Sequence, residues 1–223
     1  MENFKVLEIQ KRVYANNDEK AEILRKELKE SGTFLMNLMS SPGSGKTTTV
    51  CATIERLKQI MKIGVIEADI DSDVDAITVS KAGAEVMQLH SGGMCHLDAG
   101  MAREGLDILN SNELDFVILE NIGNLICPAS YDLGEAKKVM ILSVPEGDDK
   151  PLKYPKMFSK VDVLLISKID TVSVFDFDFD AVKERVSALN PTIQVFPISA
   201  KTGEGMDAWI NWIKEQVSTW KNK

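Results

Sequence analysis

The sequence predicts an α/β fold with a mainly parallel, seven-stranded sheet, helices on both of its faces and an appended N-terminal helix. Short apolar runs alternate along the chain with stretches of helical length. Such alternation is typical of parallel strands joined by helical crossovers. The expected strands are residues 33–39, 63–68, 84–89, 115–119, 138–143, 161–167 and 193–197. Because ligands of such folds bind at the carboxyl ends of strands, we expect the functional residues there.

Length and composition favour one large domain. The chain has 223 residues, 44% of them hydrophobic, which is enough to bury one sizeable core. We expect residues 1–32 to form a helical extension, with Asn17 as a candidate helix cap, and residues 33–223 to form the main domain. In the last helix, Trp212 falls off the apolar stripe, so it is a candidate exposed residue.

Charge and hydropathy exclude two kinds of partner. The net charge of −8 argues against nucleic acid, whose binding depends on clustered Lys and Arg. No stretch approaches the roughly 20 apolar residues of a membrane span, and no secretory apolar segment begins the chain. A cytoplasmic protein is therefore expected. The three cysteines cannot all pair within one chain, which favours metal binding or free thiols.

Residues 40–47 match the phosphate-loop pattern G-x-x-x-x-G-K-[ST] of P-loop NTPases, except that Ser40 replaces the first glycine. Two later glycines let the backbone wrap a phosphate, while successive N–H groups and the next helix bind the anion. Lys46 supplies charge at the terminal phosphates, and Thr47 offers a hydroxyl to Mg²⁺. The order of strand, loop and helix disfavours a merely flexible turn. The predicted phosphate-binding residues are Gly43, Ser44, Gly45, Lys46, Thr47 and Thr48.

Two later strand ends indicate guanine selectivity. Residues 167–170 resemble the N-K-x-D motif of GTPases, with Ser167 in place of Asn, which predicts a weaker side of the pocket. Asp170 can accept from N1–H and the 2-amino group of guanine, whereas adenine offers neither donor. The stem of Lys168 can lie along the base. Downstream, an S-A-K motif caps the guanine oxygen with its backbone, and it comprises Ser199, Ala200 and Lys201. GTP and GDP are the expected nucleotides.

Acidic residues at two strand ends predict the magnesium site. Asp69 and Glu120 each end a buried strand, and with Thr47 they offer the oxygen ligands that Mg²⁺ prefers. Asp71 and Asp73, nearby, are better interpreted as solvated or helix-capping residues. No glutamine that could orient the attacking water is evident, so GTP hydrolysis should be slow until another element is supplied. The predicted catalytic residues are Lys46, Thr47, Asp69 and Glu120.

A second metal site is predicted from two cysteines and a histidine. Cys95 and His96 are adjacent at an expected helix start, and Cys127 follows the neighbouring strand. Soft sulfur with imidazole suits Zn²⁺ or Ni²⁺, and a helix N-terminus favours the thiolate. Three ligands leave a tetrahedral site open for water or a second subunit. His90 is a weaker fourth candidate, and Cys51 is expected to be packed.

The loop of residues 120–128, with sequence ENIGNLICP, connects the two predicted sites. Gly123 is a candidate sensor of the terminal phosphate, and Cys127 lies four residues beyond it. Four residues of extended chain reach at most roughly 14 Å. A hinge movement at Gly123 would therefore displace Cys127.

Together, the phosphate loop, residues 95–99 (CHLDA), residues 120–128 and residues 146–155 (EGDDKPLKYP) resemble the HypB family, the GTPases of nickel–iron hydrogenase maturation. The resemblance runs from about residue 33 to the C-terminus. It implies a SIMIBI-class GTPase with a metal site at Cys95, His96 and Cys127, and a homodimer that depends on GTP, metal or both. It also implies a HypA-like nickel-binding partner and a hydrogenase large subunit as client. An N-terminal cysteine-rich nickel motif and a histidine-rich tract are missing, so high-affinity nickel storage is not expected.

Three alternatives remain. A urease-type nickel GTPase would share fold and metal, but that family joins its ligands as a contiguous Cys-Pro-His, which is absent. A small-molecule kinase would use the same phosphate loop with an acceptor pocket, and Asp170 and the S-A-K motif argue against it. A binding module with structural zinc and no hydrolysis is the third.

Overall fold

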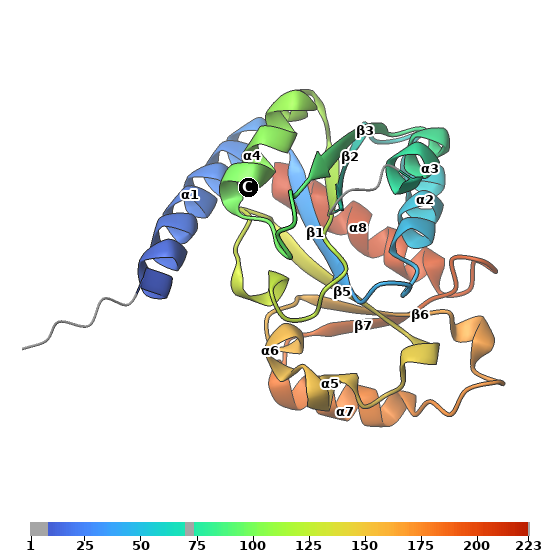
Figure 1. The fold of residues 1–223 in the computed structure, drawn as a ribbon. Helices are drawn as coiled ribbons and strands as arrows, with labels where there is room; N and C mark the ends of the chain where they lie inside the picture. Colours follow the sequence, from blue (N-terminus) through green and yellow to red (C-terminus); the bar gives the residue numbers. More distant parts are fainter. Residues whose placement is uncertain (1–8, 70–73, 223) are drawn as a thin grey trace, which may run out of the picture.

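The computed structural model describes residues 9–69 and 74–222 and contains a seven-stranded sheet of order β3-β2-β4-β1-β5-β6-β7 (Figure 1). Every pair of neighbouring strands is parallel. The strands are β1 Phe34–Ser40, β2 Ile63–Asp69, β3 Glu85–His90, β4 Phe116–Glu120, β5 Lys137–Ser143, β6 Val163–Ser167 and β7 Gln194–Pro197. The expected parallel sheet is confirmed.

Helices cover both faces of the sheet. The helices are α1 Ile9–Ser31, α2 Lys46–Leu57, α3 Val74–Ala82, α4 Ala99–Ile108, α5 Lys150–Lys153, α6 Pro155–Phe158, α7 Phe179–Leu189 and α8 Met206–Lys221. Short 3-10 turns are η1 Ser111–Glu113, η2 Pro128–Ser130, η3 Val144–Glu146 and η4 Ile169–Thr171. One face packs against α2, α3 and α8. The opposite face packs against α1 and α4 at one end and α6 and α7 at the other. In the part of the chain that the structure describes, no helix is long and apolar enough to span a bilayer.

The central strands are buried on both faces, because each is a nearly continuous apolar run between two helical layers. β1 and β4 end at the same edge of the sheet, and the phosphate loop follows β1 there. The predicted functional segments are thereby brought to one edge. Asn37 is the polar exception inside β1, and it is fully buried.

Two expectations about the helices are wrong. Asn17 lies within α1, which is already helical from Ile9, so it is not a helix cap. Its side chain instead bonds to the backbone of Ala99, at the start of α4, and of Asp132, in the loop before β5. Trp212 is buried, because its ring stacks on Trp209 and also packs near Phe196 of β7. The helical stripe of α8 is therefore wider than the spacing of its other apolar residues indicates.

Candidate functional site

The phosphate loop lies between β1 and α2 and is held by its own side chains. Gly43 and Gly45 have φ values of 74° and 95°, a left-handed conformation that favours glycine. Ser40, which replaces the usual first glycine, is fully buried. Its Oγ accepts from Ser44 Oγ at 2.6 Å and from Lys46 Nζ at 3.1 Å. Ser40 therefore anchors the lysine that the sequence assigns to the terminal phosphates.

The predicted guanine residues line one cavity of about 270 Å³ at the ends of β6 and β7. Ser199 Oγ donates to Asp170 Oδ1 at 2.7 Å, which orients the carboxylate. Lys168 adopts a left-handed conformation with φ 60°, and its Nζ donates to the carbonyl of Gly43 at 2.7 Å. The lining residues include Thr48, Ser167, Lys168, Asp170, Ser199, Ala200 and Lys201. The structure therefore brings the two base motifs together beside the phosphate loop.

Ser167 has a definite contact although it departs from the usual asparagine. Its Oγ donates to the carbonyl of Ser44 at 2.7 Å, and the residue is 3% exposed. This bond ties the base-binding segment to the phosphate loop. The expected effect of Ser167 on guanine affinity stays a prediction.

A second cavity, of about 560 Å³, adjoins the phosphate loop and contains the predicted magnesium residues. Thr47 Oγ1 donates to Glu120 Oε1 at 3.2 Å, while Glu120 Oε2 is buried without a partner. An unpaired buried carboxylate oxygen beside a hydroxyl fits a hard cation with oxygen ligands. Asp69 lines the same cavity, and so does Asp75 of α3, which the sequence did not single out. Asp71 and Asp73 lie outside the described residues.

Glu67 is a candidate that sequence reasoning missed. It stands beside Glu120 on the neighbouring strand, in register, and is 3% exposed with Oε1 unpaired. Burial and then the charge of Glu120 raise the pKa of Glu67 to about 10. Burial also raises the pKa of Glu120 to about 7, and the nearby Lys46 opposes that rise. The alternation of side chains along β2 could have revealed Glu67 as a candidate, since it lies on the same face of the strand as Asp69.

The two predicted metal-binding loops meet at their cysteines. Cys95 Sγ lies 2.7 Å from Cys127 Sγ, and His96 Nδ1 lies 3.9 Å from Cys95 Sγ. The ring of His96 stacks on Tyr131, with centroids 4.0 Å apart and planes at 14°. Across residues 9–69 and 74–222, no group of three His, Cys, Asp or Glu side chains is arranged to hold a metal ion. The structure thus brings two thiols together, with the imidazole beside the thiol of Cys95.

The expected helix start at Cys95 and His96 is wrong. α4 begins at Ala99, and Asp98 caps it by accepting from the N–H of Met101. The hydrogen bond with Cys95, followed by burial, raises the pKa of the Cys127 thiol. Cys51, by contrast, lies in α2, and its thiol contacts the carbonyl of Thr78 in α3. This contact agrees with its predicted packing role.

The loop between the sites touches the phosphate loop directly. A Cβ atom on Gly123 would lie 3.0 to 3.3 Å from three atoms of Pro42, so a side chain there would displace one loop or the other. Asn124 Oδ1 accepts from the N–H groups of Ile126 and Cys127, which makes the intervening turn compact. One short segment therefore contacts the phosphate loop at Gly123 and carries Cys127.

The family model described as CobW/HypB/UreG, nucleotide-binding domain, matches residues 34–197. The chain belongs to the CobW/HypB/UreG family. The hydrogenase maturation factor HypB of Azotobacter vinelandii is 43% identical over 96% of this chain and 71% of its own length. The hydrogenase/urease maturation factor HypB of Helicobacter pylori is 39% identical over 95% of this chain and 88% of its own length.

Solved structures agree with this assignment. HypB from Helicobacter pylori in complex with nickel has a TM-score of 0.86 and 40% identity, covering 92% of this chain and 96% of that one. The signal recognition particle receptor FtsY of Elizabethkingia anophelis in complex with GDP has a TM-score of 0.56 and 16% identity, which indicates a shared fold alone. It covers 96% of this chain and 78% of that one.

Within this member of the CobW/HypB/UreG family, the matched segment contains the phosphate loop, both acidic strand ends and the paired thiols. It ends at Pro197, just before the S-A-K residues, and begins after α1. The contacts of α1 and of Ser199 with the site are therefore features of this structure that lie outside the family model.

Proposed function

We propose that this chain is a GTPase that couples GTP binding and hydrolysis to nickel delivery during the maturation of nickel–iron hydrogenase. The observation that carries the proposal is the segment of residues 120–127, which contacts the phosphate loop at Gly123 and places Cys127 beside Cys95. Relatives at about 40% identity are named hydrogenase maturation factors, and one was crystallised with nickel. A change at the nucleotide would thus reach the thiols through a single segment.

In this proposal the nucleotide is GTP or GDP, and Mg²⁺ accompanies it. Asp170, held by Ser199, reads the base, and Lys46 with Thr47 contacts the phosphates. Asp69 and Glu120 would bind Mg²⁺, directly or through its water ligands. When bound, Mg²⁺ neutralises charge at the terminal phosphates. Among the described residues that line the phosphate cavity there is no glutamine to orient water, so a slow intrinsic rate is proposed.

The proposed cargo site uses Cys95, His96 and Cys127 for Ni²⁺ or Zn²⁺. Two thiols and one imidazole form a soft donor set with room for a fourth ligand from water or a second subunit. We therefore propose a homodimer whose formation depends on GTP, metal or both. A HypA-like nickel-binding protein and a hydrogenase large subunit are the proposed partners, in the cytoplasm.

A urease client is the second candidate. It is favoured by the name of the Helicobacter pylori relative, which combines hydrogenase and urease maturation. Metal transfer from the loaded chain to a hydrogenase large subunit and to a urease apoenzyme, compared side by side, separates the two clients.

Phosphate release from GTP and ATP, measured without any acceptor, tests the enzymatic part. A GTPase releases phosphate from GTP, and not from ATP, when no acceptor is present. Turnover that requires an added small-molecule acceptor would identify a kinase. Ni²⁺ and Zn²⁺ titrations test the cargo site with Cys95→Ser and Cys127→Ser. Cys51→Ser is the matched control, because Cys51 packs against α3. Equal metal binding by all three variants would contradict the proposed ligands.

A further inference from the structure

Helix α1 contacts one of the two loops that carry the predicted metal ligands, and it contacts the first residue of the helix that follows the other. We name residues 91–98 the Cys95 loop and residues 121–135 the Cys127 loop. α1 packs along α4, which the Cys95 loop enters, and the Cys127 loop returns past α1 to β5 (Figure 1). The two loops leave different strands, β3 and β4, that are separated in the sheet by β2. Their relative position therefore depends on what joins them beyond the sheet.

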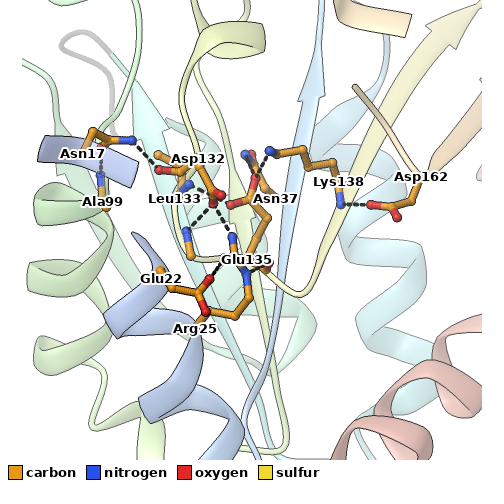
Figure 2. A network of polar contacts seen from close by, with 11 residues as sticks. Asn17, Glu22, Arg25, Asn37, Ala99, Asp132, Leu133, Glu135, Lys138 and Asp162 are labelled. Atoms are coloured by element: carbon orange, nitrogen blue, oxygen red, sulfur yellow. Dashed lines mark hydrogen bonds and ion pairs between the residues drawn. The ribbon is translucent and has the colours of Figure 1, made fainter. Parts of the chain in front are cut away.

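One side chain of α1, that of Asn17, joins the Cys127 loop to Ala99, the first residue of α4, where the Cys95 loop ends. Its Oδ1 accepts from the N–H of Ala99 at 2.9 Å, and its Nδ2 donates to the carbonyl of Asp132 at 2.8 Å. Figure 2 shows the amide lying between these two backbone groups. Ala99 is three residues after His96, and Asp132 is five residues after Cys127. Asn17 is 5% exposed, so both bonds are shielded from water.

Further contacts from α1 support the same arrangement. The ring of Tyr14 packs edge-on against Tyr131 at 5.2 Å, and Tyr131 stacks on His96 at 4.0 Å. Arg25 donates to Asp132 Oδ1 at 2.5 Å and to the carbonyl of Glu135 at 3.1 Å (Figure 2). The three rings therefore form a continuous row, in which Tyr131 of the Cys127 loop lies between Tyr14 of α1 and His96 of the Cys95 loop.

The other end of the Cys127 loop is fixed to the sheet. Asn121 Nδ2 donates to Asn37 Oδ1 at 3.1 Å, and Asn37 Nδ2 donates to Glu135 Oε1 at 3.1 Å. Glu120, the last residue of β4, lines the nucleotide cavity, whereas the side chain of Asn121, the next residue, bonds to β1. Both ends of the loop are thus held, one by β1 and one by α1, with Cys127 between them.

We propose that Asn17 is a positioning residue of the thiol–imidazole site, and that through it α1 sets the separation of Cys95 and His96 from Cys127. A buried amide that satisfies two backbone groups leaves both unpaired when it is removed, and the loops then part to let water reach them. The inference rests on the proposed metal site, because it concerns the placement of its ligands.

Asn17→Leu tests this inference, since it keeps the size of the side chain and removes both bonds. Asn17→Asp keeps the acceptor for Ala99 and places a carboxylate against the carbonyl of Asp132, so it serves if the leucine variant does not fold. Lys29→Met is the matched control on the same helix, because among the described residues the ammonium group of Lys29 contacts only the ring and carbonyl of Trp220. Thermal stability and GDP affinity are measured for all variants.

Two readouts distinguish positioning from general stability. The first is Zn²⁺ affinity, measured in the intact chain of 223 residues by competition with a chromophoric chelator. The second, without metal, is the rate at which hydrogen peroxide converts the Cys95 and Cys127 thiols to one disulfide, with two molecules of water formed per peroxide. Asn17→Leu should lower Zn²⁺ affinity and the disulfide rate at least tenfold. Lys29→Met should change each by less than about twofold.

Wild-type values of both readouts in Asn17→Leu would overturn the inference, and so would equal losses in Asn17→Leu and Lys29→Met. Failure of the proposed function looks different: the wild-type protein would bind neither Zn²⁺ nor Ni²⁺ through Cys127. The disulfide rate would still report whether Asn17 holds the two loops together.

Discussion

The nucleotide site and the thiol–imidazole site lie at the same edge of one sheet but differ in how they are built. In the nucleotide site, protein groups already hold one another: Lys46 bonds to Ser40, Ser167 to Ser44, and Asp170 to Ser199. In the other site the two thiols are adjacent, while His96 stacks on Tyr131. The first site is therefore preorganised by its motifs, and the second depends on two loops that another element must bring together.

This difference decides where each site is sensitive to change. A loop whose backbone binds the ligand keeps its shape when single contacts are lost, so the largest losses there come from the charged groups that face the ligand. A site made of side chains from separate loops is sensitive to remote contacts that set the loop positions.

The largest effect is expected for Lys46→Ala, which removes the positive charge at the terminal phosphates. GTP turnover should fall by about 10²–10³-fold, the usual loss when one preorganised electrostatic group is deleted. Phosphate release at saturating GTP measures it. Turnover within tenfold of the native rate would show that the phosphates bind elsewhere. Zn²⁺ affinity in the absence of nucleotide should stay unchanged, which keeps the two sites separable.

A smaller effect is expected for Asp170→Asn, which reverses the hydrogen-bonding pattern toward the base. GTP affinity should fall at least tenfold, because one acceptor oxygen of Asp170 becomes an N–H donor that faces the 2-amino group of guanine. Xanthosine triphosphate, which accepts where guanine donates, should gain affinity. Competition binding against a fluorescent nucleotide measures both. If ATP and GTP bind the native protein equally, the guanine assignment is wrong.

The smallest expected effect concerns the buried carboxylate beside the phosphate loop. Glu67 has a folded pKa of about 10, well above the value of about 4.3 for an exposed glutamate. Between these values the folded state holds more protons, so the free energy of unfolding falls as pH rises. Glu67→Gln should lose less stability between pH 6 and pH 9 than the native protein, by at least about 1 kcal/mol.

Urea unfolding of nucleotide-free protein at the two pH values provides this measurement. Asp180→Asn, an exposed substitution at the start of α7, is the matched control. Parallel pH profiles of the native protein and Glu67→Gln would show that Glu67 is ionised in the folded state.

The fold and the nucleotide motifs could be predicted because their information is local. The strands are continuous apolar runs, and the phosphate loop is a contiguous pattern between a strand and a helix. Glu67 was missed because its environment comes from Glu120, 53 positions away in sequence, through strand register. Asn17 was misread as a cap because its partners, Ala99 at the start of α4 and Asp132 in the loop before β5, are far from it in sequence. Trp212 was wrongly expected to be exposed, because its burial against β7 depends on how α8 packs on the sheet.

Zn²⁺ affinity measured with GDP and with a non-hydrolysable GTP analogue tests the central claim, that residues 120–127 couple the two sites. Coupling of about 1–3 kcal/mol predicts a 5- to 150-fold difference between the two nucleotide states. By linkage, Zn²⁺ must change the ratio of the two nucleotide affinities by the same factor. Cys127→Ala should abolish this coupling and leave GTP affinity intact, while Cys51→Ala should preserve it. Identical Zn²⁺ affinities in both nucleotide states would contradict the claim.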